Sequence, residues 1–359
     1  MNRALFVIGA AAAMALGAGT VASAATAGHG TTSVAGVQVG PQYSWPTGLD
    51  NRGDVVGAYS AASETRGYVW RGGAYTDLGV LNGGDYTYAT GVNDSGDVVG
   101  YSGDFAASTG VQAFEWHDGT MTELAGLGGN SFAGQINSSG LIDGAAATSS
   151  GQSYAVLWRD GKLTELPGLG GTFSGPVAMN EAGQVAGYSA TASGDDDAVL
   201  WTNGKVTDLG PGQVIALNAR GEVLVQVSPV SGPAYVFLWD HGKKIDLPAG
   251  AMANDLNDEG QVVGYYTPAG ATTQDGYVWQ DGTLTDLGTE NPVAINDRGE
   301  ILAVTDDNGL FDTVVLDHGV TITLTPTTGT SATPGFISDS GWVAGVTEAT
   351  ATATAWQLH

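Results

Sequence analysis

The sequence predicts an all-β fold, namely an eight-bladed β-propeller of four-stranded blades closed by an N-terminal strand. Three observations predict it: a turn motif recurs along most of the chain, an apolar run ending in Trp recurs at the same spacing, and the 57 glycines fall largely between these segments. A period of about 40 residues with four strands in each copy is typical of a propeller blade. A seven-bladed propeller and an open β-repeat array are the alternatives.

The repeating unit contains two predicted hairpins. The stretch Asn93-Asp94-Ser95-Gly96 predicts a type I turn closed by a glycine bulge, between two short strands. Further on, Asp118-Gly119 separates the apolar run Ala113–Trp116 from an alternating run. Such a pair predicts a two-residue turn in which both residues have positive φ. Each copy therefore holds four strands and two tight turns.

Two recurring residues show how many copies of the unit the chain contains. The first is the turn glycine, which occurs at Gly53, Gly96, Gly140, Gly183, Gly221, Gly260, Gly299 and Gly341. The second is the residue that ends the apolar run, which occurs at Trp70, Trp116, Trp158, Trp201, Trp239, Trp279, Leu316 and Trp356. Both series have eight members, and Leu replaces Trp only in the seventh copy. The repeated Trp is expected to pack between neighbouring blades.

The two ends of the repeat array are complementary. The last copy stops at the strand of Trp356 and lacks a fourth strand, whereas an extra predicted strand at 33–40 precedes the first copy. If this strand pairs with the last blade, it covers sheet edges that would otherwise be open. The sequence therefore predicts a single propeller domain over residues 31–359.

The first 24 residues have the pattern of a secretory signal peptide. Arg3 provides the positive charge, the segment from Ala4 to Leu16 is apolar, and Ala22-Ser23-Ala24 fits the cleavage pattern. The apolar segment is shorter than the about 20 residues that a membrane-spanning helix needs. We therefore expect residues 1–24 to be removed and the protein to be secreted into the extracellular space.

Composition narrows the class of partner. The chain has no Cys, 11 Lys and Arg, and 37 Asp and Glu, with a formal net charge of -26. The negative charge disfavours nucleic acid and anionic membranes as partners. A secreted chain without disulfides is expected to be bacterial and to depend on a large core. An extracellular glycan or protein remains as the expected partner, and we expect a monomer.

The repeats resemble those of a bacterial extracellular family named HAF after a His-Ala-Phe triplet before the Trp. The triplet is degenerate in this chain, as Gln112–Trp116, Tyr154–Trp158 and Tyr235–Trp239 show, and none of its copies begins with His. The turn element of Asn257–Gly264 and the second element of Trp279–Gly288 match the family more closely. The resemblance covers essentially the whole mature chain. It implies a secreted or surface β-propeller-like protein and carries over no catalytic residues.

The predicted binding face is the one that carries the longer connections, because loops on a rigid scaffold commonly carry function. Aromatic residues gather there where the first blades begin, whereas the connections near residues 213, 251 and 291 lack them. These ligand-binding candidates are Tyr43, Trp45, Tyr86, Tyr88, Phe132 and Phe173. They would stack on a sugar or on an apolar patch of a partner. The alternative is that they only cap the inner ends of the strands.

Carboxylates gather in the connections between second and third strands, and the densest run is Asp195-Asp196-Asp197. These three residues are the candidate metal site, with calcium as the ion, although they lack the alternating spacing of a calcium loop. No cofactor is otherwise expected. The sequence contains no Gly-x-Ser-x-Gly, His-Glu-x-x-His or Cys site. It therefore favours a non-catalytic binding protein over two alternatives, a hydrolase with paired Asp residues and a purely structural surface or matrix protein.

Overall fold

The computed structural model describes residues 32–104, 110–307, 310–329 and 331–359, with side chains at 306–311 left out. The predicted signal peptide, residues 1–24, lies outside the described residues. Within the described ranges the regular structure is β-strand, and the one helical segment is the short 3₁₀ helix η1 (Leu81–Gly83). No helix in this described part is long and apolar enough to span a bilayer.

Strands follow one another in groups of four, one group for each sequence repeat, except that the last repeat has three. The first four repeats hold β3 (Ser44–Leu49), β4 (Val55–Ala61), β5 (Glu64–Arg71), β6 (Ala74–Asp77), β7 (Tyr86–Val92), β8 (Val98–Gly103), β9 (Val111–His117), β10 (Thr120–Glu123), β11 (Gly128–Ile136), β12 (Ile142–Thr148), β13 (Ser153–Arg159), β14 (Lys162–Glu165), β15 (Gly170–Met179), β16 (Val185–Thr191), β17 (Asp196–Thr202) and β18 (Lys205–Pro211). The later repeats hold β19 (Gln213–Leu217), β20 (Val223–Val227), β21 (Tyr235–Asp240), β22 (Lys243–Asp246), β23 (Met252–Leu256), β24 (Val262–Tyr266), β25 (Asp275–Gln280), β26 (Thr283–Gly288), β27 (Asn291–Ile295), β28 (Ile301–Asp307), β29 (Leu310–Asp317), β30 (Val320–Thr325), β31 (Ala332–Ile337), β32 (Trp342–Thr347) and β33 (Thr352–Gln357).

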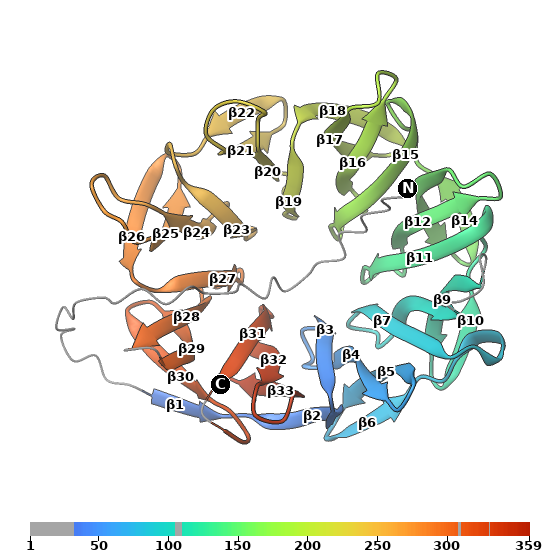
Figure 1. Ribbon diagram of the computed structural model, residues 1–359, viewed down its shortest axis with the longest axis horizontal. Helices are drawn as coiled ribbons and strands as arrows, with labels where there is room; N and C mark the ends of the chain where they lie inside the picture. Colours follow the sequence, from blue (N-terminus) through green and yellow to red (C-terminus); the bar gives the residue numbers. More distant parts are fainter. Residues whose placement is uncertain (1–31, 105–109, 308–309, 330) are drawn as a thin grey trace.

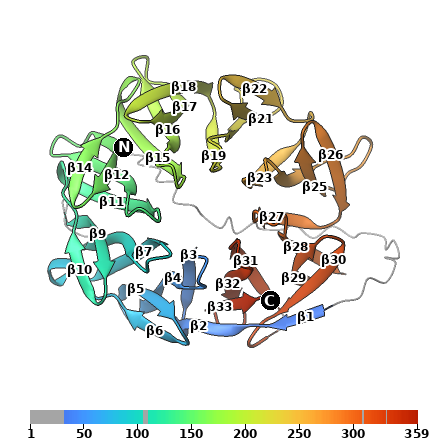
Figure 2. The same cartoon turned by 180° about the vertical axis from the view of Figure 1, so that it is seen from behind.

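The sheets form a ring, which is a β-propeller arrangement (Figure 1). The first strand of each repeat, such as β7, β19 or β31, lies toward the centre of the ring, and the fourth strands lie at its rim. The view from behind shows the same order (Figure 2). Within a repeat, successive strands are antiparallel neighbours, as the register of β7, β8, β9 and β10 shows.

The prediction of an eight-bladed propeller is wrong as stated. The described strands form six hydrogen-bonded sheets instead of eight separate four-stranded blades: three have four strands, one has five and two have eight. In each eight-stranded sheet a parallel pair, Thr65 with Tyr86 or Ser153 with Phe173, joins two successive repeats. The reason is local, because β7 and β15 begin beside the third strand of the preceding repeat. The repeat period alone does not reveal such a pairing.

The predicted N-terminal strand is two strands on two different sheets. In β1 (Thr32–Ala35), Val34 pairs in parallel with Leu324 of β30, whereas in β2 (Val37–Gln42), Val37 pairs antiparallel with Ala355 of β33. Gly36 stands between them, where an added Cβ would lie only 2.5 Å from Thr354 and 2.7 Å from Trp356. The two strands cover the edges of the seventh and last repeats, and they close the ring beside the first repeat (Figure 1).

The turn chemistry follows the sequence. Asn93 Oδ1 accepts hydrogen bonds from the backbone N–H groups of Ser95 and Asp97, at 3.0 and 2.9 Å, and Gly96 has a φ of 87°. In the second turn Asp118 and Gly119 have φ values of 44° and 87°, as a type I′ turn requires. Both turn predictions for this repeat are confirmed.

The turn asparagines also link neighbouring repeats, which the sequence analysis did not foresee. The Asn93 Nδ2 donates to the backbone carbonyl of Asn137 in the next repeat at 3.1 Å, and Asn218 Nδ2 donates to that of Asn257 at 3.1 Å. The same bond joins Asn180 to Asn218, Asn257 to Asn296, and Asn296 to Ser338. These buried side chains therefore have a second role beyond closing their own turn.

Candidate functional site

Four of the six predicted aromatic residues lie together with a fifth that the sequence analysis missed. The aromatic cluster consists of Trp45, Tyr86, Tyr88, Tyr101 and Phe132. Its members come from β3, β7, β8 and β11, so three successive repeats contribute to it. Trp45 and Phe132 lie on inner strands of the ring, in the parts of β3 and β11 that precede their tight turns. The cluster therefore lies on the side of the ring away from these tight turns.

One register position places three of these rings. Trp45, Tyr88 and Phe132 each come just before a residue that pairs with a glycine of the second strand, and a β-bulge follows each pair. The glycine is needed at this point: at Gly100 an added Cβ would lie 2.0 Å from the Tyr88 carbonyl oxygen. The corresponding residues of the other repeats are Gly175, Gln213, Met252, Asn291 and Thr333. The aromatic side chains are thus confined to one side of the ring.

The rings of the aromatic cluster form a continuous set of contacts. Tyr101 lies at its centre, stacked on Tyr88 with centroids 5.5 Å apart and on Tyr86 at 5.8 Å, and edge-on to Phe132 at 5.0 Å. Trp45 lies 6.1 Å from Tyr88. Tyr101 is only 4% exposed, whereas the other four are half-buried. The cluster has a buried base and a partly open surface, so it can still contact another molecule.

The polar groups of the cluster are uncharged. The indole N–H of Trp45 donates to the hydroxyl of Tyr88 at 2.6 Å. Burial raises the pKa of Tyr86, Tyr88 and Tyr101 above the ordinary value of a phenol. These hydroxyls remain protonated at neutral pH, and the surface offers aromatic faces and neutral hydrogen-bonding groups.

The remaining two aromatic candidates lie apart from this cluster. Tyr43 is 56% exposed and has a φ of 62°, in the turn between β2 and β3. Phe173 is 38% exposed and packs against Tyr188, with ring centroids 6.1 Å apart. Among the described side chains, no ring contact joins either of them to the five.

Asp195 lies in the connection between β16 and β17, and Asp196 and Asp197 are the first two residues of β17. Ser193 Oγ donates to Asp195 Oδ2 at 3.0 Å. Burial, and then the charge of Asp195, raise the pKa of Asp196. In the described ranges, no group of three or more His, Cys, Asp or Glu side chains could hold a metal ion. The structure thus gives no geometric support to a calcium site at this connection.

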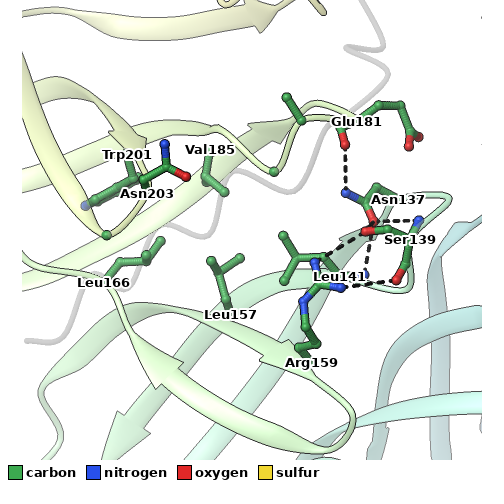
Figure 3. A pocket seen from close by; sticks show the side chains of 13 residues that line it. Asn137, Ser139, Leu141, Leu157, Arg159, Leu166, Glu181, Val185, Trp201 and Asn203 are labelled. Atoms are coloured by element: carbon green, nitrogen blue, oxygen red, sulfur yellow. Dashed lines mark hydrogen bonds between the residues drawn. The ribbon is translucent and has the colours of Figure 1, made fainter.

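Two pockets lie on the other side of the ring, among the tight turns. One, of about 260 Å³, lies between the third and fourth repeats; Leu141, Leu157, Leu166 and Val185 form much of its wall (Figure 3). Arg159 at its edge donates to the backbone carbonyl of Ser139 at 3.4 Å. The other, of about 430 Å³, lies between the sixth and seventh repeats. Function was expected only on the long-loop face, although the Leu that replaces Trp at position 316 is a signal for the larger of these two pockets.

Fold and repeats together define the class of this molecule as a β-propeller. No family model matches the chain, and no curated protein does. Solved structures that resemble it are the β-propeller domain of the trilobed protease from Pyrococcus furiosus (TM-score 0.47, 10% identity, 77% of this chain and 94% of that chain), an acylaminoacyl peptidase from Pyrococcus horikoshii (0.47, 11%, 79% and 52%) and a puromycin-hydrolysing peptidase from Mycobacterium tuberculosis (0.49, 13%, 78% and 55%). This chain matches about half the length of the latter two.

Proposed function

We propose that the protein is a secreted, non-catalytic member of the HAF-repeat family that binds an extracellular glycan or protein through the aromatic cluster. The observation that carries this proposal is the confinement of Trp45, Tyr88 and Phe132 to one register position in three successive repeats. A purely structural role for these rings would not require them on one side of the ring only. Aromatic faces with neutral hydrogen-bonding groups suit a sugar ring or an apolar patch.

The charge of the chain supports a partner without many negative charges. With a formal net charge of -26, the protein repels polyanions over long distances at low salt. The aromatic cluster itself offers no ionised group, since its tyrosines are held neutral. We therefore expect the glycan to be neutral, or the protein partner to present an apolar or basic surface.

Glycan-array and protein-capture binding of the folded chain test the proposal with one variant and one matched control. Trp45→Ala removes a ring of the cluster, whereas Thr333→Ala changes the same register position on the far side of the ring. We expect Trp45→Ala to weaken binding at least tenfold and Thr333→Ala to leave it unchanged. Equal binding by all three proteins, or no binding by wild type to either kind of partner, contradicts the proposal.

Three supplementary measurements address folding, the extent of the binding surface and export. Thermal unfolding of Trp45→Ala shows whether a loss of binding reflects unfolding, and Tyr43→Ala, at an exposed position outside the cluster, shows whether the binding surface extends to the neighbouring turn. N-terminal sequencing of protein recovered from the culture medium tests export, for which the expected new N-terminus follows Ala24. Retention of the unprocessed chain inside the cell would contradict secretion.

A further inference from the structure

The repeated Trp side chains fill the space between neighbouring repeats. Trp158, Trp201 and Trp356 are at most 1% exposed. Each donates its indole N–H to a backbone carbonyl of the preceding repeat: Trp158 to Ala125 at 2.7 Å, Trp201 to Pro167 at 2.7 Å, and Trp356 to Thr325 at 2.8 Å. The space between two repeats in this fold therefore accommodates an indole ring.

Leu316 occupies this position in the seventh repeat. It pairs with Ile301 across the sheet, as Trp201 pairs with Val185. Leu316 has no ring to extend toward the sixth repeat, and it remains half-buried whereas Trp201 is 1% exposed. The seventh repeat thus keeps the backbone of the indole site and lacks the indole.

The pocket at this position is correspondingly larger. We call it the Leu316 pocket; its apolar wall consists of Val278, Leu287, Ile295, Ile301 and Leu316. The equivalent pocket beside Trp201 has Leu157, Leu166 and Val185 at the corresponding positions (Figure 3). The volumes are about 430 and 260 Å³. Leu287 is half-buried, whereas Leu166 is 2% exposed, so the larger pocket also leaves more apolar surface in contact with water.

The polar groups at the rim of the Leu316 pocket already interact with other protein groups. Gln280 Nε2 donates to the Glu259 carbonyl at 3.1 Å, and Gln261 Nε2 donates to Gln280 Oε1 at 3.3 Å. Asp297 Oδ1 accepts from the Asp258 backbone N–H at 2.7 Å. Arg298 and His318 at the rim have acidic partners as well: Arg298 lies 2.8 Å from Glu300, and His318 Nδ1 lies 2.6 Å from Asp317 Oδ1. A charged ligand would have to compete with these contacts, whereas a neutral one need not.

We propose that the Leu316 pocket is a binding site for a neutral, planar aromatic molecule of indole size. Such a ligand takes the place that a Trp side chain has in the other repeats, and it covers the apolar wall that Leu316 leaves exposed. An engineered apolar cavity in a protein binds benzene, so apolar side chains alone can hold a small aromatic compound. The site is separate from the aromatic cluster, and it does not depend on the binding function proposed for that cluster.

Titration with indole, followed by ligand-detected NMR and calorimetry, tests this proposal on the folded protein. For a ligand of this size a Kd on the order of 0.1 to 1 mM is expected. Leu316→Trp places an indole in the pocket from the chain itself, so binding should fall at least tenfold and thermal stability should not decrease. Leu287→Phe, which narrows the pocket from the facing repeat, provides a second blocking variant. Saturable binding that both folded variants lose supports the proposal.

A matched variant tests the same idea in the opposite direction. Trp201→Leu recreates the arrangement of Leu316 between the third and fourth repeats, and it should add a second indole site of similar affinity if it folds. N-acetyltryptophanamide imitates a Trp side chain of a partner protein, so it distinguishes two sources of the aromatic ligand. Weaker binding than indole supports a free small molecule, whereas tighter binding assigns the pocket to a partner's Trp. Absence of saturable indole binding by wild type, or undiminished binding by Leu316→Trp, overturns the proposal.

Discussion

The backbone N–H of Asp339 donates a hydrogen bond to Oδ1 of Asn51 at 3.1 Å, across 288 positions of sequence. This bond joins the last repeat to the first at the tight-turn end of the ring. In the same direction around the ring, Asp297 N–H donates to Asp339 Oδ1 at 2.8 Å and Asn51 N–H donates to Asp94 Oδ1 at 3.0 Å. Asn51 takes the Asp position of its turn, so the series of bonds continues across the junction.

Asn51→Ala should therefore weaken the junction between the first and last repeats. The expected loss in the free energy of unfolding is about 0.5 to 1.5 kcal/mol, which is the usual net value of one hydrogen bond. Asn51→Asp keeps an acceptor oxygen and should lose less. Urea unfolding measures both. Ser95→Ala, at an exposed position in the corresponding turn of the next repeat, is the control and should match wild type; an equal loss in Asn51→Ala and Ser95→Ala would contradict the role of the bond.

Asp50 and Ser338 are the two exceptions in the series of turn asparagines, and Asp50 is the acidic one. Its Oδ1 accepts from the backbone N–H groups of Arg52 and Asp54, at 2.9 and 2.8 Å, as a turn Asn does. Its Oδ2 is buried without a hydrogen-bond partner, although Arg52 Nε lies 3.6 Å away. Burial raises the pKa of Asp50 to about 6, and the charge of Asp54 contributes in the same direction.

Asp50→Asn should stabilise the fold at pH 8. The folded-state pKa is raised, so the protonated acid is favoured by folding; the stability associated with it is present at low pH and is lost as pH rises through about 6. An amide is neutral at every pH and has an N–H that can donate, as Asn93 does to Asn137. We expect a gain of about 1 kcal/mol at pH 8 and a smaller one at pH 5, measured by urea unfolding. The same gain at both pH values would contradict this explanation.

Sequence reasoning succeeded where a single repeat contains the whole cause. The turn of Asn93 to Gly96 and the positive φ of Asp118 and Gly119 follow from residue types within a few positions. It failed where the cause lies between repeats, as in the parallel pair of Thr65 and Tyr86 that merges two repeats into one sheet. Spacing along the chain does not fix the distance between neighbouring strands of different repeats.

The candidate site was likewise predicted in part and missed in part. The one-sided aromatic residues were recognised from strand starts, but Tyr101 was missed because it lies at the end of the second strand. Its position opposite Tyr88 follows from the hairpin register, which the turn and the bulge together determine. Tyr43 and Phe173 lie elsewhere. Tyr43 is in the turn before β3, with a φ of 62°, and Phe173 belongs to the fourth repeat, where it packs against Tyr188.

The buried carboxyl group of Asp143 should also make the stability of the fold depend on pH. It is 1% exposed, accepts from the Gln135 backbone N–H at 2.6 Å, and has a pKa that burial raises to about 7. Because the folded-state pKa is raised, the contribution of the protonated Asp143 to stability is present below about pH 4 and is lost as pH rises to 7. Asp143→Asn keeps the acceptor for Gln135 and removes the charge. Unfolding in urea should show a gain of about 1 to 3 kcal/mol at pH 8 and little change at pH 4; a loss at pH 8 would contradict it.

Two alternating residues of β2 test how the N-terminal segment closes the ring. Val39 is fully buried, in the core with Tyr68 of the first repeat and Ala355 of the last, whereas Val37 is 47% exposed. Val39→Ala should cost about 2 kcal/mol, from lost apolar burial and the cavity left behind, and Val37→Ala less than about 0.5 kcal/mol. Hydrogen exchange should also accelerate at Thr354 and Ala355 in Val39→Ala alone. Equal losses in the two variants would mean that backbone pairing, and not this buried side chain, holds β2 against the last repeat.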